Sequence, residues 1–211
     1  MIFDGIACGQ SIVEIFATEK YLNTFPSDIK FTLVSENVFN YMSDEVTPQG
    51  ALAVVKINKS EAIGRLTRCL LLDRVQDPGN MGTILRICAA CGIKSVFTID
   101  CVDAYSPKAV RSSMSGIYHV NVIKTTKEQI VAALKEQGVS LICADMNGES
   151  LFSFDKVENF CLCMGNEGNG ICDYLIDNAS SVLSLPMKSG VESLNVAVAT
   201  AVILYNLTFN I

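Results

Sequence analysis

The stretch CLLLDRVQDPGNMGTILRICAACGIKSVFTID, residues 69–100, decides the fold class. It begins and ends with the apolar runs CLLLDRV and KSVFTID, which lack polar alternation and therefore predict buried strands. Between them, a turn at Pro78 and Gly79 is followed by GTILRICAACG, which predicts a helix that opens at Gly82. A strand, a helix and a second strand form the unit from which parallel sheets are built.

The same pattern recurs toward the C-terminus. The runs SLICADM, FCLCMG and SVLSLPM resemble buried strands, and helix-compatible segments such as TTKEQIVAALKEQG separate several of the runs. We therefore expect an α/β fold with a parallel sheet and helices on both of its faces. In such sheets ligands bind in the loops beyond the carboxyl ends of the strands.

The first part of the chain predicts a separate small α/β unit. Short strands are expected at Ile29–Leu33 and Gly50–Ile57, with a helix between them that Ser35 opens as its cap. The polar join Asn58–Glu61 makes a reasonable boundary. The expected domains are residues 1–58 and 63–211.

Composition predicts a folded protein of the cytoplasm without a membrane partner. Half of the residues are hydrophobic and 18% are charged, enough apolar material for a packed core. The longest apolar stretch, Val196–Tyr205, is well short of the roughly 20 residues that a membrane-spanning helix needs. The N-terminus carries Asp4 and no basic region, unlike a secretory signal.

The cysteines do not predict a metal site. Cys88 and Cys91 have a C-x-x-C spacing, but no second pair or histidine cluster completes a four-ligand set. Buried reduced thiols are the favoured interpretation. The single histidine, His119, lies in an extended-looking stretch and is interpreted as structural, so no metal is expected.

Three segments carry polar residues at the predicted strand ends, and each has an ordinary alternative. Residues 73–93 are either an anion site at a helix N-terminus or a plain turn with Arg86 on a solvated face. Residues 164–170, MGNEGNG, are either a loop that lets the backbone approach a ligand or a surface turn. In residues 185–206, Ser193 is either an N-cap or part of a site.

The helix that follows Ser193 is apolar on nearly every face. A helix of this kind is expected to be buried, here between the sheet and a partner subunit.

In this order and spacing, the three segments resemble the signature motifs of the SpoU (TrmH) family of RNA ribose 2′-O-methyltransferases, in the SPOUT class. Residues 35–55 resemble the end of the small ribosomal-protein-like substrate-binding domain of some members, and residues 106–120 also look like a family segment. Related proteins carry an earlier, often basic segment before the point matching Met1, so this small domain is expected to be N-terminally truncated.

The resemblance implies a C-terminal trefoil knot, a homodimer formed through the knot region and the C-terminal helix, and S-adenosylmethionine as cofactor. Arg86 matches the catalytic arginine, and the surrounding polar positions are matched by Asn80, Glu167, Ser193 and Asn195. The expected cofactor-binding residues are Gly165, Leu185 and Leu194, together with Ala144, Met164 and Met187. Lys108 and Arg111 are candidates for contact with RNA phosphate, with a solvated helix face as the equal alternative.

The function expected from this resemblance is methyl transfer from S-adenosylmethionine to a ribose 2′-hydroxyl of RNA, with ribosomal RNA as the default substrate. Transfer RNA, a non-catalytic RNA- or cofactor-binding protein, and another nucleotide-binding α/β enzyme are the alternatives. The net charge of −6 is divided equally between residues 1–60 and 61–211, which argues against a broad basic surface. A basic RNA track must then be local or assembled across a dimer.

Overall fold

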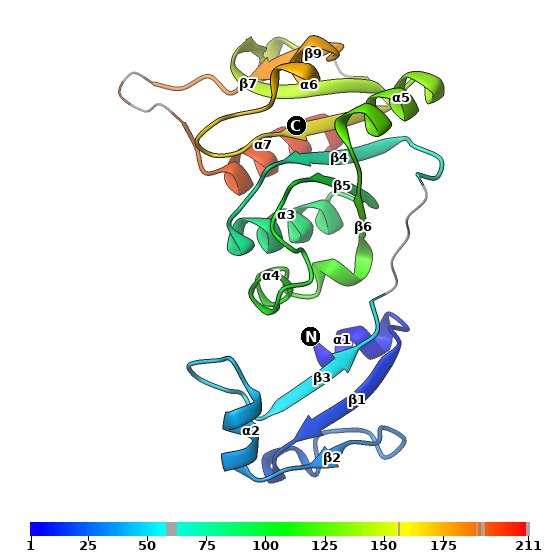
Figure 1. Cartoon of the computed structure of the whole chain (residues 1–211), viewed down its shortest axis with the longest axis vertical. Helices are drawn as coiled ribbons and strands as arrows, with labels where there is room; N and C mark the ends of the chain where they lie inside the picture. The colour runs from blue at the N-terminus through cyan, green and yellow to red at the C-terminus, as the bar shows by residue number, and fades with distance from the viewer. Residues whose placement is uncertain (58–62, 156, 189, 191–192, 210–211) are drawn as a thin grey trace. The chain divides into compact units, whose positions relative to one another are not determined.

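The computed structural model describes residues 1–57, 63–155, 157–188, 190 and 193–209. The chain divides into two compact units, Met1–Asn58 and Lys59–Ile211 (Figure 1). The polar join expected at Asn58–Glu61 lies outside the described residues. Among the helices that are described, none has the length and apolar character needed to cross a membrane.

The larger unit is built on one sheet of parallel strands in the order β6-β5-β4-β8-β7-β9. The apolar runs that predicted buried strands all lie in this sheet. Its strands are β4 (Arg68–Asp73), β5 (Ser95–Ile99), β6 (Asn121–Lys124), β7 (Ser140–Ser150), β8 (Phe160–Met164) and β9 (Ser181–Ser184).

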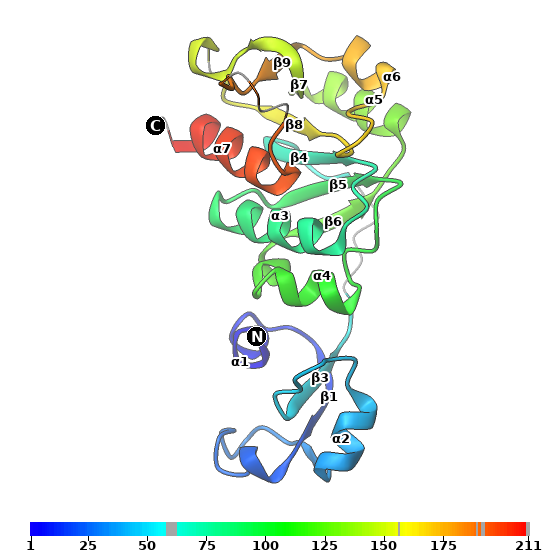
Figure 2. The ribbon, with the colours of Figure 1, turned by 90° about the vertical axis from the view of Figure 1, so that its left-hand side faces the viewer.

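Helices cover both faces of the sheet, which confirms the expected α/β architecture. One face carries α3 (Pro78–Ala90) and α7 (Val196–Phe209), and the other carries α5 (Lys127–Gln137) and α6 (Asp173–Asp177) (Figure 2). Successive side chains of a strand point to opposite faces. Leu70 of β4 therefore packs in the cluster with α3 and α7, whereas Leu71 packs in the cluster with α5 and α6.

The order of the strands reverses beside β4. From β4 the chain adds β5 and then β6 on one side, and the later strands lie on the other side with β8 next to β4. The carboxyl ends of β4 and β8 therefore border a topological switch point, where open parallel sheets bind their ligands.

Helix α3 begins earlier than the sequence predicted. The turn expected at Pro78 and the helix start expected at Gly82 are wrong, because Pro78 is the first helical residue and Asp77 is the N-cap. Proline suits the first helical position, since its missing N–H has no partner there anyway. An added Cβ at Gly82 would overlap the carbonyl oxygen of Ala109, so this glycine allows close packing of α4 against α3.

Short helices complete the larger unit, and His119 lies in one of them rather than in an extended stretch. They are α4 (Pro107–Ser112), η2 (Gly116–His119) and η3 (Leu151–Ser153).

The smaller unit contains a three-stranded sheet in the order β2-β1-β3. The helix expected after Ser35 is confirmed, with the Ser35 hydroxyl capping it at the backbone N–H of Val38. The central strand β1 was not predicted, and the strand expected at Ile29–Leu33 is reduced to two residues. The elements are α1 (Ile2–Ala7), β1 (Ile12–Ala17), η1 (Glu19–Tyr21), β2 (Thr32–Leu33), α2 (Glu36–Met42) and β3 (Ala51–Val55).

Candidate active site

Three side chains from distant parts of the chain meet beyond the carboxyl ends of the strands. Asn80, near the start of α3, donates from Nδ2 to Oε1 of Glu167 at 2.7 Å. Asn195 donates from Nδ2 to Oδ1 of Asn80 at 3.0 Å. The fold thus brings together three of the polar residues that the sequence singled out, and the amide of Asn80 joins the other two.

Asn80 is held in place by the cap of α3. The carboxylate of Asp77 accepts a hydrogen bond from the backbone N–H of Asn80 at 2.8 Å. This hydrogen bond, with a further contribution from the ion pair to Lys108 at 3.4 Å, lowers the pKa of the Asp77 carboxyl. The first turn of the helix, and with it the Asn80 side chain, is therefore fixed by an ionised cap.

Glu167 stands on a tight loop that Asn166 shapes. The backbones of Asn166 and Gly170 exchange hydrogen bonds of 3.1 and 2.9 Å across the loop. The Oδ1 atom of Asn166 also accepts from the N–H groups of Gly168 at 2.9 Å and Asn169 at 3.0 Å. These bonds enclose Glu167 in a loop of defined shape.

Asn195 has a second role as the cap of α7. Its Oδ1 atom accepts hydrogen bonds from the backbone N–H groups of Ala197 at 2.9 Å and Val198 at 3.3 Å. The alternative in which Ser193 caps this helix is therefore wrong; Ser193 is exposed two residues before the cap.

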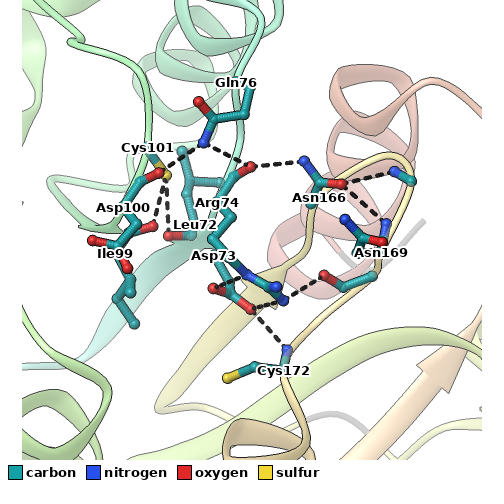
Figure 3. Close-up of polar contacts among 12 residues, drawn as sticks. Leu72, Asp73, Arg74, Gln76, Ile99, Asp100, Cys101, Asn166, Asn169 and Cys172 are labelled. Atoms are coloured by element: carbon teal, nitrogen blue, oxygen red, sulfur yellow. Dashed lines mark hydrogen bonds and ion pairs between the residues drawn. The ribbon is translucent and has the colours of Figure 1, made fainter.

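An ion pair between a buried carboxylate and a partly exposed guanidinium lies at the end of β4 (Figure 3). Asp73 is 1% exposed, and its two carboxylate oxygens accept from Nε and Nη2 of Arg74, each at 3.0 Å. The backbone N–H of Cys172 donates to the same carboxylate at 2.7 Å. The hydrogen bond to Asp73 raises the pKa of Arg74, so the guanidinium stays charged.

The same arginine reaches the loop that carries Glu167. Its Nη2 donates to the carbonyl of Gly170 at 3.3 Å, and Nδ2 of Asn166 donates to the carbonyl of Arg74 at 2.9 Å (Figure 3). The sequence reasoning missed Asp73, Arg74 and Asn166. A signal was present, because an acidic residue that ends a fully apolar run is buried only when it is paired.

Arg86 is not joined to the network around Asn80. It lies six residues, less than two turns, further along α3, about 9 Å along the helix axis at the usual rise. Its side chain is exposed, and within the described part of the chain it forms no hydrogen bond or ion pair. Gly116 packs against its backbone, where an added Cβ would lie 2.6 Å from Cα of Arg86.

The residues expected to bind the cofactor lie on or after neighbouring strands. Met164 ends β8 and is buried, Leu194 precedes α7 and is 41% exposed, and an added Cβ at Gly165 would overlap the backbone of Gly170. The remaining three are partly buried, in β7 or directly after β9: Ala144, Leu185 and Met187.

Lys108 and Arg111 both lie on α4 with exposed side chains. Because Lys108 pairs with the cap residue Asp77, this helix stands beside the start of α3.

Cys88 is buried on α3, and Cys91 is buried at the C-cap of the same helix. Burial raises the pKa of both thiols, that of Cys91 to about 11. The interpretation of this pair as buried thiols is confirmed.

Beside the topological switch point, the site combines the hydrogen-bonded network of Asn80, Glu167 and Asn195 with the exposed side chain of Arg86 further along α3. It is suited to holding a polar ligand by hydrogen bonds and to stabilising negative charge.

Comparison with known proteins agrees with this geometry. The model of the SpoU rRNA Methylase family matches residues 67–205. The chain is 35% identical over 188 residues to the 23S rRNA (guanosine(2553)-2'-O)-methyltransferase RlmP of Bacillus subtilis (strain 168), covering 86% of this chain and 75% of that protein.

Two solved structures are similar to this chain in fold. A putative RNA methyltransferase of the TrmH family from Porphyromonas gingivalis is 30% identical, with a TM-score of 0.84 over 95% of this chain and 84% of that chain. The AdoMet-bound rRNA methyltransferase from Sinorhizobium meliloti shares the fold at 24% identity, with a TM-score of 0.86 over 98% of this chain and 83% of that chain. The chain therefore belongs to the SpoU rRNA methylase family.

Proposed function

We propose that this protein transfers a methyl group from S-adenosylmethionine to a ribose 2′-hydroxyl of ribosomal RNA. The observation that carries the proposal is the Asn80–Glu167–Asn195 network, which joins the three segments that resemble the family motifs at one edge of the sheet. Relatives named as 23S rRNA 2′-O-methyltransferases support ribosomal RNA as the substrate.

The residues present fit S-adenosylmethionine. Apolar side chains in and after the neighbouring strands β7, β8 and β9 offer surface for a purine and an alkyl chain, and Gly165 allows a tight loop there. When bound, the cofactor supplies an electrophilic methyl group on a sulfonium centre. The residues proposed to hold it are Gly165, Leu185, Leu194, Ala144, Met164 and Met187.

Arg86 is the residue to which we assign the chemistry on the acceptor. A ribose hydroxyl is a weak acid, so negative charge that develops on its oxygen must be stabilised. Because a guanidinium is effectively always protonated, Arg86 orients the acceptor and stabilises that charge instead of removing the proton. Asn80, Glu167, Ser193 and Asn195 fix the surrounding loops, so that the acceptor and the methyl donor are aligned.

The RNA is held outside this network. Lys108 and Arg111 on α4 are the proposed phosphate contacts, since both are exposed beside the start of α3. The unit Met1–Asn58 is the proposed substrate-binding domain, which the likeness of residues 35–55 to such domains supports.

Two copies of the chain are proposed to pair through the knot region and α7. Four exposed apolar side chains of α7 recur at helical spacing and form one stripe. Two copies of such a stripe can pack against each other about a two-fold axis, as in an isologous dimer. Its members are Val198, Val202, Tyr205 and Phe209.

A trefoil knot at the C-terminal end belongs to the same proposal. Two features support it: α7 packs on the face that carries α3, and the cap of α7 is bonded to Asn80 near the start of that helix.

The test is methyl transfer from labelled S-adenosylmethionine to ribosomal RNA isolated from a strain deleted for the gene, with transfer RNA from the same strain as a parallel substrate. Label is expected in a single 2′-O-methyl nucleoside of ribosomal RNA. Label in transfer RNA alone would favour the transfer RNA alternative. Cofactor binding without transfer to either RNA would favour the non-catalytic one.

A further inference from the structure

The end of β4 holds a backbone conformation that its residue type disfavours. Arg74 has φ of +60°, in the left-handed region where glycine is the usual residue. A non-glycine residue there is strained, and it persists when the surrounding structure fixes it. The contacts of Arg74 identify what fixes it.

The backbone of Arg74 is bonded on both sides. Its N–H donates to the carbonyl of Ile99 at 2.9 Å. Its carbonyl accepts from Nδ2 of Asn166 at 2.9 Å and from Nε2 of Gln76 at 3.3 Å, and Gln76 also donates to the carbonyl of Asp100 at 2.7 Å (Figure 3). The left-handed turn thus presents this carbonyl to the loop after β8.

The side chain of Arg74 returns to the same loop. Its guanidinium forms both hydrogen bonds with the buried carboxylate of Asp73 and one with the carbonyl of Gly170. A glycine would satisfy the backbone without strain, but it would supply none of these side-chain contacts. The strain at this position is therefore associated with contacts that only the arginine side chain makes.

Arg74 and Asn166 together hold both ends of the loop. Asn166 binds the carbonyl of Arg74 while its other amide atom accepts from Gly168 and Asn169, the residues that follow Glu167. Gly170 is bound by the Arg74 guanidinium and, across the loop, by the backbone of Asn166. Glu167 lies between these two anchored points.

We infer that Arg74 is a positioning residue, which fixes the loop Asn166–Gly170 so that Glu167 meets Asn80. The inference deepens the proposed function and rests on it for the role of Glu167. In this role Arg74 touches neither substrate nor cofactor and acts only through the placement of Glu167.

The decisive variant is Arg74→Gly, which suits the left-handed backbone and deletes only the side chain. Met114→Gly is the matched control, because Met114 also has a positive φ, 45°, and its side chain is exposed on the segment after α4. Since Arg74→Gly leaves the buried Asp73 carboxylate without its partner, the pair Asp73→Asn with Arg74→Gly is measured as well. The asparagine oxygen still accepts from Cys172.

The first readout does not depend on activity. Hydrogen exchange at the amides of Gly168, Asn169 and Gly170 is expected to become at least about tenfold faster in Arg74→Gly and in the double variant, and to stay unchanged in Met114→Gly. Unchanged exchange in the double variant would overturn the inference, whatever the enzyme's activity.

The second readout is a double-mutant cycle with Glu167→Ala, which removes the oxygen that accepts from Asn80. Arg74→Gly is expected to lower kcat/KM at least about tenfold, and adding Glu167→Ala to it should cost little more, because both changes remove the same function. If the two losses multiply, the inference is overturned. Full activity of Glu167→Ala alone would instead overturn the role of Glu167 in the proposed function, and the exchange result would still decide the role of Arg74.

Discussion

The site depends on single amide side chains that act as donor and acceptor at once. Asn80 donates to Glu167 and accepts from Asn195, and Asn195 donates to Asn80 while it caps α7. A neutral amide can do both, whereas a carboxylate only accepts. Substitutions between asparagine and aspartate therefore separate the two roles.

Asn195 provides the clearest separation. Asn195→Asp keeps the capping oxygen but loses the donor to Asn80, so stability should stay near that of the wild type while transfer falls by up to about 10²-fold. Asn195→Ala should also destabilise the protein by about 1 kcal/mol. Denaturant unfolding and methyl-transfer rates measure the two effects. An aspartate variant with wild-type activity would show that the bond to Asn80 is dispensable.

Asp77 predicts a dependence of stability on pH. Its pKa in the folded protein is lowered, mainly by the hydrogen bond from the N–H of Asn80. The stability that the ionised Asp77 contributes is therefore fully present above the ordinary carboxyl pKa of 3.8. It is lost as the pH falls through the lowered pKa of the folded protein. Asparagine also caps helices, so Asp77→Asn should leave the free energy of unfolding at pH 7 almost unchanged. Below the ordinary carboxyl pKa, this free energy should fall less steeply with decreasing pH in Asp77→Asn than in the wild type.

Urea unfolding of both proteins across the acid range measures this effect. If the free energy of unfolding falls equally steeply with decreasing pH in the wild type and in Asp77→Asn, the lowered pKa of Asp77 at the cap of α3 is contradicted.

At the scale of elements, the loop after β8 depends on a glycine that has no room for a side chain. Gly165→Ala would drive Cβ into the backbone of Gly170, so the loop must move and cofactor binding should weaken at least about tenfold. Gly168→Ala is the matched control, because its nearest atom, Oδ1 of Asn166, would lie at an ordinary 3.5 Å. Calorimetric titration with S-adenosylmethionine compares them, and equal affinities would argue against Gly165 as a cofactor-binding position.

Five of the six strands in the sheet of the larger unit were predicted, because their residues form apolar runs; β6 was missed, because its end residues Asn121 and Lys124 are polar and exposed. Runs such as FCLCMG contain no polar alternation, and they form β8 and its neighbours. The starts of helices were harder to predict, because they depend on which side-chain oxygen accepts hydrogen bonds from the first free backbone N–H groups. At α3, Asp77 and Pro78 decide the start, and at α7 Asn195 displaces Ser193. Strand β1 was missed because its exposed residues Val13 and Glu14 hide its alternation.

Part of the site could also be predicted. Asn80, Glu167 and Asn195 stood out through the order of their motifs, and the structure joins them. Asp73 at the end of an apolar run signals that this carboxylate has a partner, but the sequence does not identify the partner. Neither the left-handed φ of Arg74 nor its contact with the loop after β8 has a local signature.

At the scale of the whole molecule, the net charge of −6 limits how RNA is held. Few cations can contact phosphates, so affinity must come from a local cluster such as that on α4, or from two copies acting together.

The stripe on α7 provides a test of assembly. The double change Val198→Glu and Val202→Glu places charges in the proposed dimer contact, so the mass measured by light scattering should fall to that of one chain. The matched control is Val13→Glu with Val54→Glu, since both valines are exposed in the smaller unit. If the wild type is a monomer, or if both double variants keep the mass of two chains, the proposed interface is wrong.

Arg86 carries the central claim, because it alone is assigned to the acceptor. Arg86→Ala should bind S-adenosylmethionine within about twofold of the wild type and lose transfer by at least about 10²–10³-fold. Arg68→Ala is the matched control, because Arg68 begins β4 at the opposite end of the strand and donates to the carbonyl of Glu158.

The most direct measurement is ribose methylation of ribosomal RNA at nucleotide resolution in the deletion strain, complemented with the wild type, Arg86→Ala or Arg68→Ala at equal protein levels. We expect one 2′-O-methyl position to be lost in the deletion strain and restored by the wild type and Arg68→Ala, but not by Arg86→Ala. Full restoration by Arg86→Ala, or no change at any position in the deletion strain, would contradict the account.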